Sequence, residues 1–244
     1  MIVLATDFGV GSPYVGQMHA TLHLLAPGIA VVDLFADLPA FRPDLASPLL
    51  AAYAPWFPAD TVFVAVVDPG VGSERAPLMI QADGRWFVGP DNGLLAHVCK
   101  QAKRCHVQAI TSQQADLSVS FHGRDLFAPA AASLARGDPV AATPHNRPGD
   151  HVSDDLACIV YIDAYGNAMT GIRASNLTDD ARLCVNGTTI AHARVFADAA
   201  PGGLFWYANS VGLVELAANQ ASAARRLDLA PGIQVEVADN AASA

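Results

Sequence analysis

The chain has 244 residues, of which 52% are hydrophobic and 15% charged, and its net charge is −9 at pH 7. This composition excludes a disordered chain and provides enough apolar material for one large domain or two small ones. Lys100 and Lys103 are the only lysines. Binding to a nucleic-acid backbone requires a basic surface, so we expect no nucleic-acid partner.

The sequence also argues against a membrane protein. The most apolar stretch, residues 46–56, is interrupted by Ser47, Pro48 and Pro55 and is far shorter than the roughly 20 residues of a membrane span. The four cysteines are scattered with no C-x-x-C motif, and the chain begins on a strand-like segment rather than on a leader. We expect a cytoplasmic protein with reduced thiols.

The first part of the chain alternates strand-like and helix-like segments. Ser12 and Pro13 form a helix-start signal after the first apolar run, and the helix they begin carries an apolar residue every three or four positions. Asp83-Gly84 lies between two apolar runs and predicts a β-hairpin. Strands are expected at residues 2–5, 29–34, 61–67, 78–81, 86–88 and 107–110, and helices at 13–26, 43–53, 92–101 and 125–136. This order predicts an α/β domain with a mostly parallel sheet over residues 1–136.

A different pattern follows. Residues 137–155 hold three prolines and two glycines without periodicity and are expected to form a linker. Beyond them, short apolar runs alternate with Gly, Asn and Asp, which is typical of small all-β domains. The expected strands are residues 157–162, 182–185, 192–196, 205–208 and 233–237. We therefore predict a smaller, barrel-like β domain over residues 156–244.

Candidate reactive residues stand at strand ends, where the ligand crevice of a parallel sheet lies. Asp7 and Asp68 each follow an apolar strand and precede glycines. Arg75 lies seven residues after Asp68, across a glycine-rich loop, and could fold back to pair with it. His122, next to Gly123, is the residue type best suited to exchange a proton near neutral pH.

Six motifs taken together resemble one known family, the S-adenosyl-L-methionine (SAM) hydroxide adenosyltransferases, which are SAM hydrolases related to the fluorinase and chlorinase. The resemblance runs in order through nearly the whole chain. The motifs are TDFGVGSPYVGQMHA at residues 6–20, VVDPGVGSER at 66–75, VGPDNGLL at 88–95, FHGRDLFAPAAA at 121–132, YIDAYGN at 161–167 and NSVGLVELA at 209–217.

The resemblance implies a hydrolase that cleaves SAM at C5′ with an activated water, giving adenosine and L-methionine without a metal or other cofactor. It also implies a homotrimer that binds its substrate between subunits. The implied catalytic residues are Asp68, Arg75 and His122. The implied substrate-binding residues are Asp7 at the ribose, Asp163 and Ser210 at the methionine part, Asn167 and Phe196 at the adenine, and Glu215. Asp68 and His122 stand where the halogenases carry tyrosines, so no halide pocket is expected.

Two alternatives remain at this stage. Asp7, Asp68, Asp91 and Asp125 could serve as strand-end ligands in a metal-dependent phosphohydrolase. The same clefts could instead belong to a non-catalytic protein that binds adenosine or SAM.

Overall fold

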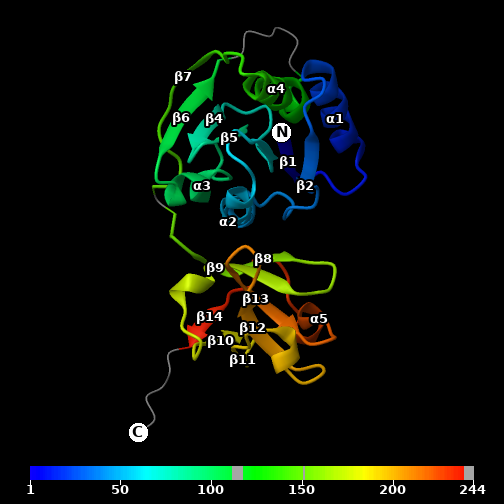
Figure 1. Cartoon of the computed structure of the whole chain (residues 1–244), viewed down its shortest axis with the longest axis vertical. Helices are drawn as coiled ribbons and strands as arrows, with labels where there is room; N and C mark the ends of the chain where they lie inside the picture. Colours follow the sequence, from blue (N-terminus) through cyan, green and yellow to red (C-terminus); the bar gives the residue numbers. More distant parts are fainter. Residues whose placement is uncertain (112–117, 151, 239–244) are drawn as a thin grey trace. The chain divides into compact units, whose positions relative to one another are not determined.

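The computed structural model describes residues 1–111, 118–150 and 152–238 (Figure 1). The chain divides into two compact units, Met1–Asp154 and Asp155–Ala244. The first is an α/β unit and the second is built mainly from antiparallel strands, as the sequence predicts. Within the described residues, none of the helices has the length and apolarity to cross a membrane.

A seven-stranded mixed sheet forms the centre of the first unit, in the order β2-β1-β3-β5-β4-β6-β7. Neighbours from β2 to β5 pair in parallel, whereas β4, β6 and β7 add antiparallel pairings. Its strands are β1 (Ile2–Thr6), β2 (Val31–Phe35), β3 (Val62–Val66), β4 (Pro77–Ala82), β5 (Arg85–Pro90), β6 (Cys105–Ile110) and β7 (Ala142–Pro144). Because the chain passes from β1 to β2 on one side and then to β3 on the other, the strand order reverses between β1 and β3. A ligand crevice is expected there.

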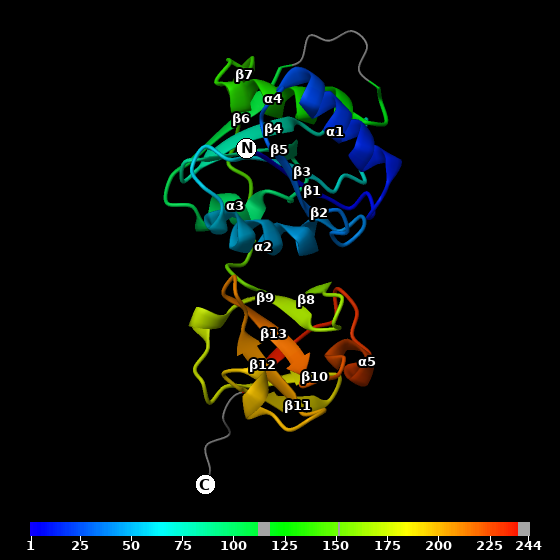
Figure 2. The same ribbon diagram turned by 45° about the vertical axis from the view of Figure 1, so that its right-hand side comes forward.

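Helices cover both faces of this sheet (Figure 2). α1 (Pro13–Leu25) and α4 (Ala128–Arg136) contact each other on one face, and α2 (Pro43–Tyr53) and α3 (Ala96–Gln101) contact each other on the other. α1 begins where its signal predicts, since the Ser12 hydroxyl accepts a hydrogen bond from the Tyr14 N–H at 3.2 Å. Its residues Met18 and Leu22 are fully buried in the core.

The predicted hairpin is also present. Asp83 and Gly84, with φ of 45° and 81°, connect β4 to β5, and Ala82 pairs with Arg85 across the turn. Two positive φ values are what the favoured two-residue hairpin turn requires. Within residues 137–155, the segment expected as a linker, Ala142–Pro144 instead form β7 and pair with β6.

The second unit holds a four-stranded sheet, β12-β13-β9-β8, and a three-stranded sheet, β11-β10-β14. Side chains from both sheets, among them Ile159, Leu183 and Leu216, share one buried core. The elements are β8 (Leu156–Ile162), β9 (Ala168–Arg173), β10 (Arg182–Val185), β11 (Thr188–Ala191), β12 (Leu204–Ala208), β13 (Leu213–Ala218), α5 (Ala223–Leu227) and β14 (Glu236–Ala238).

One predicted strand of this unit is wrong, and three of its strands, β9, β11 and β13, were not predicted. Residues 192–196 form no strand: β11 precedes them, and Phe196 opens a short 3-10 helix, Phe196–Asp198. β9 and β13 were not predicted because Gly171 and Glu215 interrupt their apolar patterns. Glu215 is nevertheless 2% exposed, and its neighbours satisfy its carboxylate.

Candidate active site

A cavity of about 260 Å³ opens at the carboxyl ends of β1 and β3, where the strand order reverses. Asp7 directly follows β1 and Asp68 follows β3, and both line the cavity. They meet because Thr6 and Val66, at the ends of the two strands, are in register. The two strand-end carboxylates therefore line the same cavity.

Asp68 and Arg75 form a buried, two-point ion pair. Nε of Arg75 donates to Oδ1 of Asp68 at 2.8 Å, and Nη2 of Arg75 donates to Oδ2 of the same carboxylate. The two side chains are 4% and 8% exposed, respectively. Two parallel N–H···O bonds in a nearly dry environment hold the carboxylate in one orientation.

His122 joins this pair through Arg75. Its Nδ1 lies 2.9 Å from Nη2 of Arg75. A guanidinium can only donate, so Nδ1 must be the acceptor and the neutral ring carries its proton on Nε2. Partial burial, and then the charge of Arg75, lower the pKa of His122 below its ordinary value of 6.5. The imidazole is therefore neutral at physiological pH.

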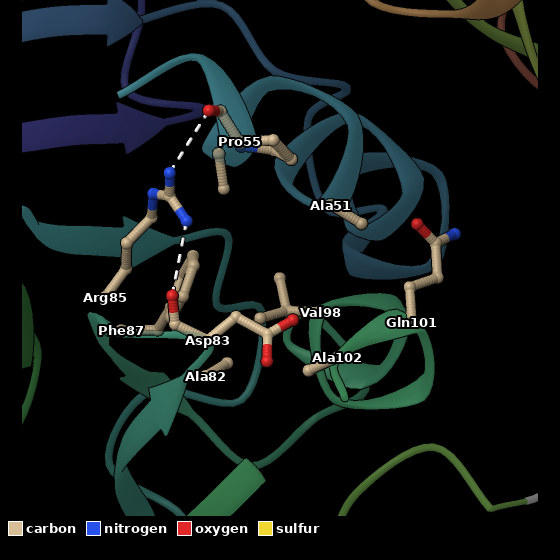
Figure 3. A pocket seen from close by; sticks show the side chains of 10 residues that line it. Ala51, Pro55, Ala82, Asp83, Arg85, Phe87, Val98, Gln101 and Ala102 are labelled. Carbon is tan, nitrogen blue, oxygen red and sulfur yellow. Dashed lines mark hydrogen bonds between the residues drawn. The ribbon is translucent and has the colours of Figure 1, made fainter. Parts of the chain in front are cut away.

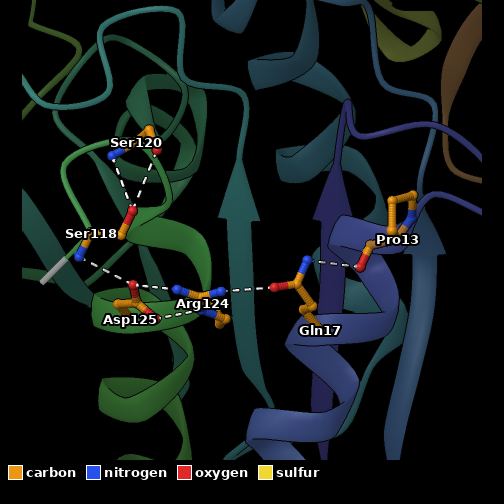
Figure 4. A network of polar contacts seen from close by, with 6 residues as sticks. All are labelled: Pro13, Gln17, Ser118, Ser120, Arg124 and Asp125. Atoms are coloured by element: carbon orange, nitrogen blue, oxygen red, sulfur yellow. Dashed lines mark hydrogen bonds and ion pairs between the residues drawn. The ribbon is translucent and has the colours of Figure 1, made fainter.

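The segment that carries His122 is held on both sides (Figure 4). His122 precedes a single π-helical turn, Gly123–Phe127, which runs into α4. Arg124 in that turn donates to the side chain of Gln17 on α1 at 2.7 Å, and pairs with the carboxylate of Asp125. Asp125 also accepts a hydrogen bond from the Ser118 N–H at 3.2 Å. These contacts fix the turn against α1 and against the segment that precedes it.

Asp7 lies on the cavity wall beside the aromatic side chains. Its Oδ2 accepts a hydrogen bond from the backbone N–H of Phe41 at 3.0 Å. Burial is the main cause that raises the pKa of Asp7, and the nearby charge of Asp68 adds to it. Phe41 has a φ of 62°, so a rarely used backbone conformation presents its N–H to the carboxylate.

Three rings form an apolar wall that the motif analysis did not single out. The ring centroids of Phe8, Tyr14 and Phe121 lie 5.3 to 5.8 Å apart in tilted or edge-to-face arrangements. All three line the cavity together with Phe41 and Val71. The sequence did offer a signal for this wall, because the three aromatic residues lie within two of the six motifs, at residues 6–20 and 121–132. A wall of this kind suits a flat, apolar ligand group.

In the second unit, the predicted substrate-binding residues Asp163, Asn167 and Glu215 lie in two hydrogen-bonded groups. The carboxylate of Asp163 accepts hydrogen bonds from the backbone and the side chain of Asn167, at 2.8 and 3.0 Å. The carboxylate of Glu215 accepts from the Tyr207 hydroxyl at 2.7 Å and from the Asn209 amide at 2.8 Å. Burial is the main cause that raises the pKa of Glu215, and the charge of Asp163 adds to it.

Phe196 and Ser210 lie at the edges of this group. Phe196 is exposed, and its ring centroid lies 5.3 Å from that of Tyr207, the residue that hydrogen-bonds Glu215. Ser210 is exposed, on the turn that Asn209 closes by accepting from the N–H groups of Val211 and Leu213.

A second cavity, of about 170 Å³, lies between α2, α3 and the β4–β5 hairpin (Figure 3). The charged side chains that line this cavity form hydrogen bonds with backbone groups. Arg85 donates to the carbonyl oxygens of Pro55 and Phe57, and the carboxylate of Asp83 accepts from the N–H groups of Lys103 and Arg104. Among the described residues that line this second cavity, no carboxylate and imidazole occur together as Asp68 and His122 do in the first.

The four aspartates of the phosphohydrolase alternative do not converge. Asp91 pairs with His145 at 3.0 Å, and Asp125 pairs with Arg124. In the part of the chain that the structure describes, no three His, Cys, Asp or Glu side chains gather as a metal site would require.

An α/β unit with this crevice, followed by a unit built mainly from antiparallel strands, defines the class of two-domain fold, and sequence matching identifies the family. Residues 2–143 match the SAM hydroxide adenosyltransferase N-terminal domain, and residues 157–236 match the C-terminal domain of the same family. The chain belongs to the SAM hydroxide adenosyltransferase family.

Individual proteins agree with this assignment. The chain is 37% identical to an (R)-S-adenosyl-L-methionine hydrolase of Salinispora arenicola, with 97% of both chains covered. A protein of the same name from Thermus thermophilus is 35% identical, with 97% of this chain and 98% of the relative covered. A fluorinase of Nocardia brasiliensis is 22% identical over 97% of this chain and 96% of its own length. The crystal structure of an uncharacterized conserved protein from Thermotoga maritima superposes with a TM-score of 0.88 at 28% identity, covering 98% of this chain and 100% of that one.

Proposed function

We propose that this protein hydrolyses S-adenosyl-L-methionine to adenosine and L-methionine, with Asp68, Arg75 and His122 acting on the attacking water. The observation that carries the proposal is the contact of these three side chains at the cavity, since Arg75 binds both Asp68 and His122. Family membership and the names of the hydrolase relatives supply the substrate.

The hydrogen-bonding capacity of Asp68 and His122 gives each of them a different role toward the attacking water. Because Nδ1 of His122 faces Arg75, only Nε2–H can point to a water, and it holds that water by donation. Asp68 uses one lone pair of each oxygen for Arg75 and keeps acceptor capacity for the water proton. We therefore assign Asp68 as the general base and His122 as the group that positions the water. The residue type alone suggests that His122 exchanges a proton with the water, and the tautomer with the proton on Nε2 argues against His122 as a base.

The step balances as a displacement at carbon. The water oxygen forms a bond to C5′, the C5′–S bond breaks with its electron pair going to sulfur, and the water proton moves to Asp68. The sulfonium becomes neutral methionine thioether and needs no acid. Charge neutralisation of this kind is favoured in a water-excluding cavity. A positioned general base contributes about 10² to 10⁴ in rate.

The remaining substrate contacts are part of the same proposal. Asp7 would accept hydrogen bonds from the ribose hydroxyls, and Phe8, Tyr14 and Phe121 would supply an apolar wall beside them. In the second unit, Asp163 and Ser210 would bind the methionine part and Asn167 and Phe196 the adenine, while Glu215 is hydrogen-bonded to Tyr207, whose ring contacts Phe196. The two carboxylates of that group suit a ligand that carries an ammonium.

We further propose a homotrimer that binds its substrate between subunits. The support on this chain is that Tyr14, Phe41 and Val71, which line the cavity, are 52%, 73% and 37% exposed. Apolar side chains gathered around a cavity mouth mark an interaction surface. Sedimentation of the purified protein distinguishes a trimer from a monomer.

The reaction is tested by incubating the purified protein with SAM in ¹⁸O-labelled water. Chromatography should show adenosine and methionine, and the label should appear on the 5′-oxygen of adenosine. A binding protein without activity would return intact SAM. Parallel samples with EDTA, chloride or fluoride test the metal-dependent and halogenase alternatives, which predict lost activity or a halogenated nucleoside.

A further inference from the structure

Two of the four cysteines lie in direct contact, although the sequence places them in no recognised motif. Sγ of Cys99, in α3, is 2.9 Å from Sγ of Cys105, the first residue of β6. Cys99 is fully buried, whereas Cys105 is partly exposed. The other two cysteines, Cys158 and Cys184, lie in the second unit.

The surroundings make the two thiols unequal. Contact with Cys99 is the main cause that lowers the pKa of Cys105, and the same contact, followed by burial, raises the pKa of Cys99. The guanidinium of Arg147, which donates through Nη2 to the carbonyl oxygen of Cys99, favours the thiolate form at both sulfurs. Cys105 is therefore the accessible nucleophile, and Cys99 is the buried thiol behind it.

We propose that Cys99 and Cys105 form a site of reversible oxidation, which a low-molecular-weight disulfide such as oxidised glutathione converts into an intramolecular disulfide. The sulfur atoms need to approach only from 2.9 Å to about 2.0 Å. The connection between α3 and β6 consists of residues 102–104, so the new bond closes a short loop at the end of the helix.

The exchange proceeds in two steps that balance. The Cys105 thiolate attacks one sulfur of oxidised glutathione, whose S–S bond breaks and releases one glutathione thiolate. The Cys99 thiol then attacks Sγ of Cys105, the bond from Sγ of Cys105 to glutathione breaks, and the second glutathione leaves with the proton of Cys99. In total, two protein thiols are oxidised and one glutathione disulfide is reduced to two glutathione thiols.

The sequence offers a direct readout of the bond. Lys100, Lys103 and Arg104 lie between the two cysteines, so trypsin separates residues 86–100 from residues 105–124. After treatment with oxidised glutathione and blocking of the remaining thiols, we expect these two peptides to stay joined, with the loss of two hydrogens, and to separate on reduction. Cys158 and Cys184 should be recovered outside any intramolecular bond.

Variants test the order of the steps. Cys99→Ser should stop at a mixed disulfide of Cys105 with glutathione, and Cys105→Ser should abolish the joined peptides. Cys184→Ser, which removes a partly exposed thiol of the second unit, is the matched control and should form the bond like the unchanged protein. The proposal is overturned if the unchanged protein accumulates glutathionylated Cys105 without joined peptides, or if oxidation joins other cysteines. This outcome is independent of the proposed hydrolase activity.

Discussion

Nη2 of Arg75 lies 2.9 Å from Nδ1 of His122, forty-seven positions further along the chain. The same guanidinium binds both oxygens of Asp68, so one cation orients a carboxylate and an imidazole at once. This arrangement assigns the proton of the neutral imidazole to Nε2, and it penalises a second proton on Nδ1 because that proton would face the cation.

The first prediction concerns pH. Protonation of His122 would break its contact with Arg75, and burial and the Arg75 charge place its pKa below 6.5. We expect the turnover rate to be level around neutral pH and to fall as the pH drops below 6.5, through the lowered pKa. A pH profile of kcat measures this. In His122→Asn, whose side chain does not titrate, the rate should be lower and this inflection should be absent. A wild-type profile that stays level down to the onset of acid unfolding would contradict the assignment.

The second prediction concerns the general base. Asp68→Asn removes the proton acceptor, so we expect the turnover rate to fall by about 10² to 10⁴. It also leaves the buried Arg75 without its counter-charge, which typically costs about 3 to 5 kcal/mol of unfolding free energy. Rates are therefore compared only below the unfolding transition of the variant.

A surface ion pair provides the control for that variant. Asp44 pairs with Arg42 at an exposed site, where both side chains are about half-accessible. Asp44→Asn should change the unfolding free energy by less than about 1 kcal/mol and leave the rate intact. Equal rates in Asp68→Asn and the unchanged protein would rule out Asp68 as the base.

The third prediction separates binding from chemistry. Asp7 is assigned to the ribose and does not touch the Arg75 group, so Asp7→Asn should weaken adenosine binding more than it slows turnover at saturating SAM. We expect affinity to fall by roughly tenfold, the loss of about one charge-assisted hydrogen bond. Calorimetric titration with adenosine measures it, with 2′-deoxyadenosine as the matched ligand. If both proteins bind adenosine equally, Asp7 does not hold the ribose.

The fourth prediction concerns the loop between Asp68 and Arg75. Gly72 has a φ of +82°, and a Cβ built there would lie 2.5 Å from the backbone oxygen of Val119. Gly72→Ala should therefore displace the loop and lower both activity and thermal stability, by about 1 to 3 kcal/mol of unfolding free energy. Gly70→Ala lies in the same loop, where the nearest atom to a Cβ is the Ser73 hydroxyl at 3.4 Å, and should be tolerated. Thermal unfolding and rate assays on both variants distinguish the two positions.

The sequence alone determined the features that depend on neighbouring residues. The start of α1 at Ser12 and Pro13, the two-residue turn at Asp83 and Gly84, and the alternation of strands and helices all follow from backbone preferences and apolar spacing within a few positions. The resemblance of six motifs supplied the family, and the domain matches confirmed it.

Only the tertiary structure decided which distant groups touch. Three such contacts depend on the order of the strands and on the side of the sheet that each helix covers. They join Arg75 with His122, Cys99 with Cys105, and Arg124 with Gln17. Glu215 is a residue for which the sequence alone misleads, because a carboxylate within an apolar run indicates that a strand has ended. Its partners Tyr207 and Asn209, which allow it to lie inside β13, are known only from the folded structure. Local sequence sets the conformation of a segment, whereas the partners of a buried polar group come from residues far along the chain, and only the folded packing brings them together.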